Sequence, residues 1–259
     1  MVNARFGYAY LSSTATASAT LTASGYAASN AVALDRGTTW KSSGTTASQQ
    51  LILNMGAAIT PTFFAVAGGN YSGWGTTLLR YSSTGLAASW TTINTLAGLG
   101  SLTDSTQDYY EKVTSAPSRQ YWCLEWSAPS AAPEVAIFYL GTLATLTENY
   151  AFPETQEDVY NVDIQQSEGK VIVAEQTARL LTRWPLLWDV VSSTTKGTLQ
   201  TIVQSEGGPK RPFWFVPIDE STSNDYGRAY FIRYQNPSMA FKRAFTGIYE
   251  VAVPLLEEV

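Results

Sequence analysis

Residues 120–126 read QYWCLEW, a largely apolar run with the length and aromatic content of a buried β-strand. Its cysteine, Cys123, is expected to behave as a small buried hydrophobic side chain. Many short strands separated by turn residues are typical of a β-sandwich or jelly roll, so we expect the first part of the chain to be β, apart from one helical turn near residues 29–34. Similar runs, with Gly, Ser, Thr and Asn clusters between them, lie at 50–53, 62–67, 77–81 and 134–140.

The composition of the chain changes near residue 148, where a polar stretch that contains Pro153 begins. Residues 1–148 carry 6 Lys and Arg and 7 Asp and Glu, whereas residues 149–259 carry 10 and 14 and have bulkier apolar runs. A shift of this kind within a chain of 259 residues indicates two domains. We therefore predict one domain over residues 1–148 and a second over residues 149–259.

The second domain is predicted to be a β-sandwich with one helix packed on it. Residues 193–204 have a helical pattern, with Ser and Thr available for the N-cap and Gly207-Gly208 to end the helix. Pro185 places the long apolar run around it at a sheet edge or bulge, or divides it in two. The expected strands lie at 159–164 and 170–174, which form a hairpin that turns at 167–169, and at 180–190, 212–217, 228–234 and 247–258.

The chain contains no histidine and one cysteine. Histidine is the usual proton-transfer group near neutral pH and the commonest metal ligand. Its absence excludes Ser-His-Asp hydrolases, Cys-His proteases and His-ligated zinc enzymes. Paired carboxylates remain, in Asp219-Glu220 and in Glu154 with Glu157, but adjacent residues on a strand point to opposite faces and these pairs lie where turns are expected. We therefore expect no enzyme.

Charged residues make up 14% of the chain, and the net charge is -5. A polar surface with so few charges suits a protein that is covered by neighbours, because hydroxyl groups cost less to desolvate than charges. The negative net charge argues against nonspecific binding to nucleic acid, which needs clustered Lys and Arg. No stretch approaches the roughly 20 apolar residues that a membrane-spanning helix needs.

Four stretches of the first domain occur in the order found in a known family: ASNAVALDRGTTWKS at 28–42, QLILNMG at 50–56, SRQYWCLE at 118–125 and VAIFYLG at 135–141. They resemble motifs of discoidin, or F5/8 type C, domains. Two positions depart from the family's pattern: Arg36 separates Asp35 from Gly37, and Asn54 stands where an aspartate is usual. The resemblance implies a galactose-binding-like jelly roll over residues 1–148.

The same resemblance implies two kinds of site. In many relatives the loop within the first motif holds a structural calcium ion, which leaves Asp35 and Thr38 as its possible ligands here. The alternative is that both side chains only hydrogen-bond the local turn. Sugar binding would use exposed aromatic rings, and Tyr71 and Trp74 in the loop NYSGWG at 70–75 are the candidates. The alternative for Trp74 is that it folds back and plugs the end of the barrel. Apart from calcium, no cofactor is expected.

The second domain has an aromatic strand after a basic turn, GPKRPFWF at 208–215, and a last strand that ends in acidic residues, YEVAVPLLEE at 249–258. This order resembles bacteriophage tail proteins of the tube and distal-tail kind. The resemblance implies a structural virion protein at the tail tip or baseplate of a long-tailed phage, made in the host cytoplasm and assembled with other tail proteins as a homo-oligomeric ring. The alternative is a carbohydrate-binding module protein that recognises host-surface glycans.

Charged residues on the last strands are candidate assembly contacts, because a head-to-tail ring closes exposed β edges between subunits. Basic residues of one subunit would then pair with acidic residues of the next. The alternative is an ordinary solvated strand face. The residues concerned are Arg228, Arg233, Lys242, Arg243, Glu250, Glu257 and Glu258.

Overall fold

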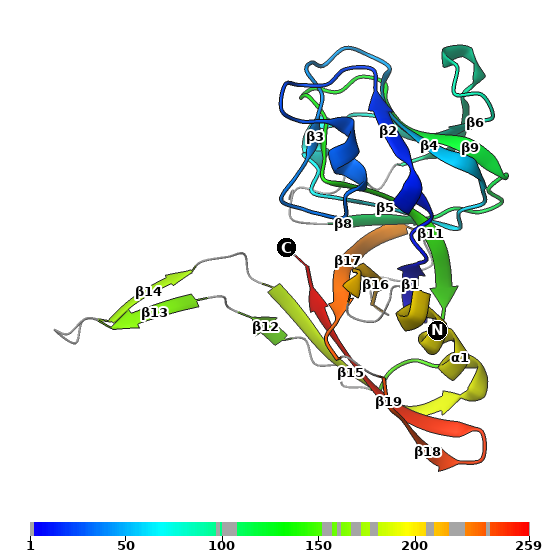
Figure 1. Ribbon diagram of the computed structural model, residues 1–259, viewed down its shortest axis with the longest axis vertical. Helices are drawn as coiled ribbons and strands as arrows, with labels where there is room; N and C mark the ends of the chain where they lie inside the picture. Colours follow the sequence, from blue (N-terminus) through cyan, green and yellow to red (C-terminus); the bar gives the residue numbers. More distant parts are fainter. Residues whose placement is uncertain are drawn as a thin grey trace. The chain divides into compact units, whose positions relative to one another are not determined.

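The structure is a computed structural model that describes residues 3–96, 99, 108–151, 157–159, 162–166, 172–176, 181–205, 210–217, 226–236 and 239–258. Its described elements are mostly β-strands, joined by short 3-10 turns and by α1 (Ser193–Ser205), which confirms the prediction of a mainly β fold (Figure 1). The turns are η1 (Leu11–Thr14), η2 (Ala28–Val32), η3 (Tyr71–Gly73) and η4 (Ala87–Ser89).

The chain divides into two compact units whose limits differ from the predicted domains. The first unit comprises Met1–Leu146 together with Phe213–Phe231, and the second comprises Thr147–Pro212 together with Ile232–Val259. The first division lies close to the predicted boundary at residue 148. Phe213–Phe231, however, belong with the N-terminal unit, and Trp214, Val216, Ala229 and Phe231 are part of its barrel core.

The first unit contains a sandwich of two sheets. One sheet has the strand order β2 (Thr16–Ala19), β4 (Gln49–Ile59), β9 (Arg119–Trp126), β6 (Thr77–Ser82) and β7 (Thr91–Thr95). It packs through one apolar core against β11 (Ile137–Thr145), β5 (Phe63–Ala67) and β8 (Asp108–Lys112). The apolar run at residues 120–126 is therefore part of β9, the middle strand of its sheet. Cys123 within it is fully buried, as predicted.

The second sheet of this sandwich continues into a closed barrel. β11 pairs with β1 (Arg5–Tyr8), β1 pairs with β16 (Phe213–Val216), and β17 (Tyr226–Tyr234) completes the ring between β16 and β8. The barrel has its own apolar core, which includes Trp214 and Phe231. β16 and β17, whose residues are predicted to belong to the second domain, thus supply two walls of this barrel. The small ladder of β3 (Trp40–Lys41) with β10 (Glu134–Val135) lies outside both sheets.

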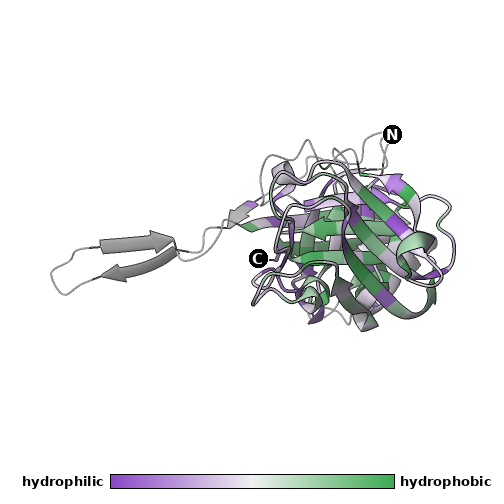
Figure 2. Ribbon diagram, turned by 90° about the horizontal axis from the view of Figure 1, so that it is seen from above, coloured by the Kyte–Doolittle hydropathy of each residue, from purple (hydrophilic) through white to green (hydrophobic). Residues whose placement is uncertain are grey.

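The strand β5 is buried on both faces, because it is shared by the sandwich and the barrel. Its alternate residues Phe64 and Val66 belong to the sandwich core, and Phe63, Ala65 and Ala67 belong to the barrel core. A strand buried on two sides needs a continuous apolar run, which is what residues 63–67 provide. Figure 2 shows strands in the interior of the ribbon in green, the colour of apolar residues.

Close packing around Phe63 also determines which residue type fits at position 7, in the barrel strand β1. A Cβ atom added at Gly7, in β1, would lie 2.2 Å from the Phe63 ring. This distance is far below a van der Waals contact, so only glycine fits at this point of β1 without movement of the ring.

In the second unit, β15 (Leu181–Ser192) lies between β12 (Glu157–Val159) and β19 (Ile248–Glu257), and β19 also pairs with β18 (Phe241–Phe245). The predicted hairpin is present as the antiparallel pair β13 (Val162–Gln166) and β14 (Ile172–Gln176). Pro185 does not divide β15: it lies opposite Pro254, and the irregularity falls later, between Trp188 and Val191.

The helix α1 follows β15 directly, at the position that the sequence predicts. The Ser192 hydroxyl accepts a hydrogen bond from the Thr195 backbone N–H at 3.2 Å, which caps the first turn. Leu199 and Ile202, three residues apart, are buried on one side of the helix. The predicted stop signal Gly207-Gly208 lies outside the described residues.

Candidate functional site

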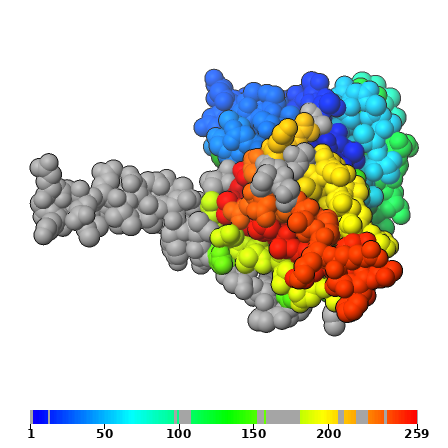
Figure 3. All heavy atoms as spheres, turned by 60° about the horizontal axis from the view of Figure 1, so that its bottom comes forward, coloured from blue at the N-terminus to red at the C-terminus, as the bar shows by residue number. Residues whose placement is uncertain are grey.

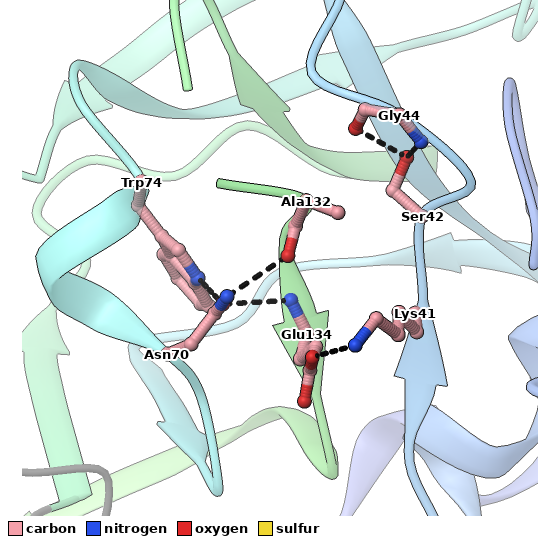
Figure 4. Close-up of polar contacts among 7 residues, drawn as sticks. All are labelled: Lys41, Ser42, Gly44, Asn70, Trp74, Ala132 and Glu134. Atoms are coloured by element: carbon pink, nitrogen blue, oxygen red, sulfur yellow. Dashed lines mark hydrogen bonds and ion pairs between the residues drawn. The ribbon is translucent and has the colours of Figure 1, made fainter. Parts of the chain in front are cut away.

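The loops at one end of the sandwich are held together by Asn70 (Figure 4). Its side-chain oxygen accepts hydrogen bonds from the Trp74 indole N–H at 2.8 Å and from the Glu134 backbone N–H at 2.9 Å. Its side-chain nitrogen donates to the Ala132 carbonyl at 2.9 Å. One amide therefore joins the loop after β5 to the segment that leads into β10, and fixes both.

The rings of Tyr71 and Trp74 are buried, which corrects the prediction that they form an exposed sugar-stacking surface. Trp74 has no exposed area and packs edge-on against Trp126, with ring centroids 5.2 Å apart. The Tyr71 hydroxyl donates to the Val66 carbonyl at 3.1 Å. The cause is the Asn70 bond to the indole N–H, which allows the Trp74 ring to turn inward without an unsatisfied donor. The alternative weighed in the sequence analysis, a plug for the end of the fold, is what the structure shows for Trp74.

An exposed tyrosine lies beside the same loops. Lys41 of β3 and Glu134 of β10 form an ion pair, and their side chains are 37% and 31% exposed. The Lys41 ammonium lies 5.8 Å from the centre of the Tyr26 ring, which is 42% exposed. A hydrogen bond between the Ala23 N–H and the Lys41 carbonyl at 2.9 Å keeps the Tyr26 loop next to β3. We name this surface the Tyr26 surface, made of Tyr26, Lys41 and Glu134.

The ion pair of the Tyr26 surface also favours the charged form of Lys41. The hydrogen bond and negative charge of Glu134 raise the pKa of Lys41 above its ordinary value. The surface thus offers an aromatic face, a cationic donor and a carboxylate acceptor within one group of loops. The sequence alone does not indicate Tyr26 as a site residue, because one tyrosine among Ala, Ser and Gly residues has no periodic pattern.

The predicted calcium ligands Asp35 and Thr38 make the contacts of a local turn. One carboxylate oxygen of Asp35 accepts the Gly37 backbone N–H at 2.8 Å, and the other lies 3.3 Å from the Thr38 hydroxyl. Nowhere in the described part of the chain do three His, Cys, Asp or Glu side chains gather as a metal site would require. These contacts are those of the turn alternative, and calcium binding stays a prediction.

Arg36, the residue that departs from the discoidin pattern, forms a buried ion pair with Asp108 of β8. The two side chains are 7% and 1% exposed. The Asp108 carboxylate also accepts the backbone N–H of Phe231 at 3.3 Å, and the guanidinium carbon of Arg36 lies 5.9 Å from the Phe231 ring centre. Arg36 therefore connects the turn at residues 35–38 to β17.

The predicted assembly residues have partners within the chain. Arg233 pairs with Glu258, and Lys242 pairs with Glu250 at 3.1 Å. The buried Glu257 carboxylate accepts the Thr182 N–H at 3.1 Å. The remaining two contact neighbours: Arg243 donates to the Phe245 carbonyl at 3.4 Å, and Arg228 stacks on Tyr230. Pairing between subunits remains a prediction.

Of the carboxylates considered for catalysis, Glu157 pairs with Arg183 at 3.4 Å, whereas Glu154, Asp219 and Glu220 lie outside the described residues. Across the described part of the chain, no helix is both long enough and apolar enough to cross a membrane.

No protein-family model and no curated protein matches this sequence. Among solved structures, the chain is similar to chitosan-binding module 1 of a chitosanase/glucanase from Paenibacillus sp. IK-5, with 19% identity over 52% of this chain and 98% of the module, at a TM-score of 0.43. It is also similar to the family 32 carbohydrate-binding module of Clostridium perfringens NanJ, solved with galactose, with 17% identity over 54% of this chain and 99% of the module, at a TM-score of 0.42. The fold described above rests on the strand order and core packing of this chain.

Proposed function

We propose that this protein binds carbohydrate through the Tyr26 surface. The observation that carries the proposal is the exposed Tyr26 ring next to the Lys41–Glu134 pair. The C–H face of a pyranose ring packs well on an exposed aromatic side chain, because both surfaces are flat and partly apolar. A few polar groups around such a ring then give orientation and specificity.

The two charged side chains have complementary roles in this proposal. The Lys41 ammonium donates hydrogen bonds to ring hydroxyl oxygens, and the Glu134 carboxylate accepts from hydroxyl groups. Because each neutralises the other, binding a neutral sugar leaves no unpaired charge at the surface. Asn70 and the buried Trp74 hold the loops beneath in one conformation, which lowers the entropy cost of binding. No step in this function is catalytic.

The test is calorimetric titration with galactose and with chitosan oligosaccharides, the ligands named for the solved modules above. Tyr26→Ala is expected to weaken binding by about tenfold, since it removes the stacking face. The matched control is Leu86→Ala, which truncates another exposed apolar side chain of the same unit, 68% exposed. Binding that survives Tyr26→Ala unchanged would refute the proposal.

We propose as a second function a structural role in a bacteriophage tail tip, supported by apolar residues on the surface of the second unit. Leu187 and Val190 of β15 are exposed, and Ala252 lies opposite Leu187 on β19. Phe245, at the end of the edge strand β18, is 72% exposed. Figure 3 shows β18 and β19, in orange and red, on one face of the molecule. Exposed apolar side chains and an open strand edge are liabilities for a monomer and are covered in an assembly.

This second proposal predicts a homo-oligomeric ring in contact with other tail proteins in the virion. Light scattering should give a mass that is a multiple of the chain mass, and Leu187→Glu should lower it. A monomer at all concentrations, or an antibody label that falls away from the tail in micrographs of particles, would refute it.

A further inference from the structure

A second surface in the first unit lies along the pairing of β8 with β17. In this ladder Tyr226 lies opposite Glu111, and Arg228 lies opposite Tyr109. Alternation along β17 places Tyr226, Arg228 and Tyr230 on one side of the strand. Ala229 and Phe231, on the other side, belong to the barrel core. We name Tyr226 and Arg228 together the Arg228 surface; Tyr230 and Glu111 are buried beside it.

Both acidic side chains of β8 that lie across this ladder, Glu111 and Asp108, are already engaged; Asp108 pairs with Arg36. One oxygen of Glu111 accepts the Tyr109 hydroxyl at 2.8 Å, and the other accepts the side-chain amide of Asn94 from β7. Glu111 is only 8% exposed, so these two donors hold it at the edge of the sandwich core. Its carboxylate is thereby occupied by two donors and mostly buried.

Arg228 makes no ion pair with any residue that the structure describes. Its guanidinium carbon lies 4.7 Å above the centre of the Tyr230 ring. In the same unit Arg36 pairs with Asp108 and Arg80 pairs with Glu125. Stacking on a tyrosine fixes the guanidinium plane and leaves its N–H groups for an external acceptor.

An exposed ring lies on the same side of β17. Tyr226 is 39% exposed, and its ring centre lies 6.4 Å from that of the buried Tyr109, which supports it from below. Residues two apart on a strand are separated by about 7 Å, roughly the width of one sugar ring with a substituent. The backbone positions that carry the Tyr226 ring and the Arg228 guanidinium are therefore about one sugar unit apart.

We propose that the Arg228 surface binds a carboxylate-bearing sugar, a uronic or sialic acid. The carboxylate takes the two-pronged hydrogen bond of Arg228, and the pyranose ring packs on Tyr226. A single cation in a chain of net charge -5 does not suit the repeated phosphates of a nucleic acid. The Arg228 surface shares no residue with the Tyr26 surface. This proposal can therefore be tested independently of the proposed function.

The experiment is calorimetric titration of the full chain with oligogalacturonate, oligomannuronate and a sialyl oligosaccharide, each compared with its methyl ester. The ester keeps the sugar ring and removes the charge. Wild-type protein should bind at least one acid form about tenfold more tightly than its ester, because a charge-assisted hydrogen bond is lost. Added salt should weaken binding of the acid form and leave the ester unaffected.

Three variants locate the binding. Arg228→Gln should lower affinity for the acid form to that of the ester, and Tyr226→Ala should weaken both forms. Arg119→Gln is the matched control, because Arg119 also stacks on a tyrosine, Tyr81, at 5.6 Å and should leave binding unchanged. Near-ultraviolet circular dichroism checks that each variant is folded.

Several outcomes would overturn this inference. Equal affinity for the acid and ester forms would show that Arg228 does not bind the carboxylate. An Arg228→Gln variant that binds the acid form as tightly as wild type would show the same. Binding to none of the three sugars, or displacement by polyglutamate as efficient as by the sugar itself, would show that no carboxylated-sugar site exists here. Loss of acid-sugar binding in Tyr26→Ala would place the ligand on the other surface.

Discussion

Arg36 and Asp108 form a buried ion pair that joins the turn before β3 to β8, and Asp108 also binds the backbone of Phe231 in β17. The pair therefore connects this turn with β17, the strand that completes the barrel. Arg36 therefore has a structural role within the first unit.

Removal of one member of this pair should destabilise the protein strongly. Asp108→Ala leaves the Arg36 charge buried without its counter-ion, and we expect the free energy of unfolding to fall by about 3–5 kcal/mol. Urea unfolding followed by tryptophan fluorescence measures the change. Glu250→Ala, which breaks the exposed pair with Lys242, should cost at most about 1 kcal/mol.

The double variant Arg36→Leu/Asp108→Leu separates charge from packing. Because it removes both charges together, it should recover most of the stability that Asp108→Ala loses. A double variant as unstable as the single one would show that the contacts of these side chains, rather than their charges, hold the loop to β17.

Two glycine substitutions test the packing of the barrel. Gly7→Ala places a methyl group against the Phe63 ring, and we expect a loss of about 1–3 kcal/mol in the free energy of unfolding. Gly197→Ala is the control: it lies in α1 with nothing within 4 Å of the added methyl group, and should stabilise the helix by up to about 1 kcal/mol. Equal effects of the two changes on the urea midpoint would contradict the described barrel.

The buried carboxyl of Glu111 should make stability depend on pH. Burial raises its pKa above the ordinary value of 4.5, so the folded state holds this proton more tightly than the unfolded state. The free energy of unfolding should therefore fall as pH rises from 4.5 through the raised pKa, and level off above it. Glu111→Gln should flatten this part of the stability–pH curve. A curve with the same slope in both proteins would show that Glu111 is not the group responsible.

Cys123 should be chemically silent in the folded protein. Burial raises the pKa of its thiol, and the thiolate is the reactive form. A thiol reagent such as DTNB should react only after unfolding in urea, at a rate set by the opening of the first unit. Rapid labelling of the native protein would mean that β9 is accessible to solvent.

The strands of the first unit could be predicted because their apolar runs are strong and local. Residues 63–67 and 120–126 are strands in the structure, and the helix after Ser192 has its cap and its buried face in the sequence. The place of residues 213–216 could not be predicted, because an apolar strand fits a barrel wall or a separate sheet equally well. Its pairing with β1 joins residues far apart in the chain.

The candidate site was harder to predict than the fold, for a physical reason. Trp74 and Tyr26 both lie in loops of small polar residues, and composition alone does not separate a buried ring from an exposed one. A hydrogen bond from the Trp74 indole to Asn70 decides that Trp74 turns inward. Tyr26 instead lies beside Lys41 of β3 and stays exposed.

The measurement that tests the central claim most directly is nuclear magnetic resonance mapping of backbone shifts during titration with the neutral sugar that the protein binds best. The account predicts that shifts concentrate at Tyr26, Lys41 and Glu134 and that they disappear in Tyr26→Ala. Shifts that leave these three residues unmoved while others change, or no shifts at all with any sugar, would contradict it.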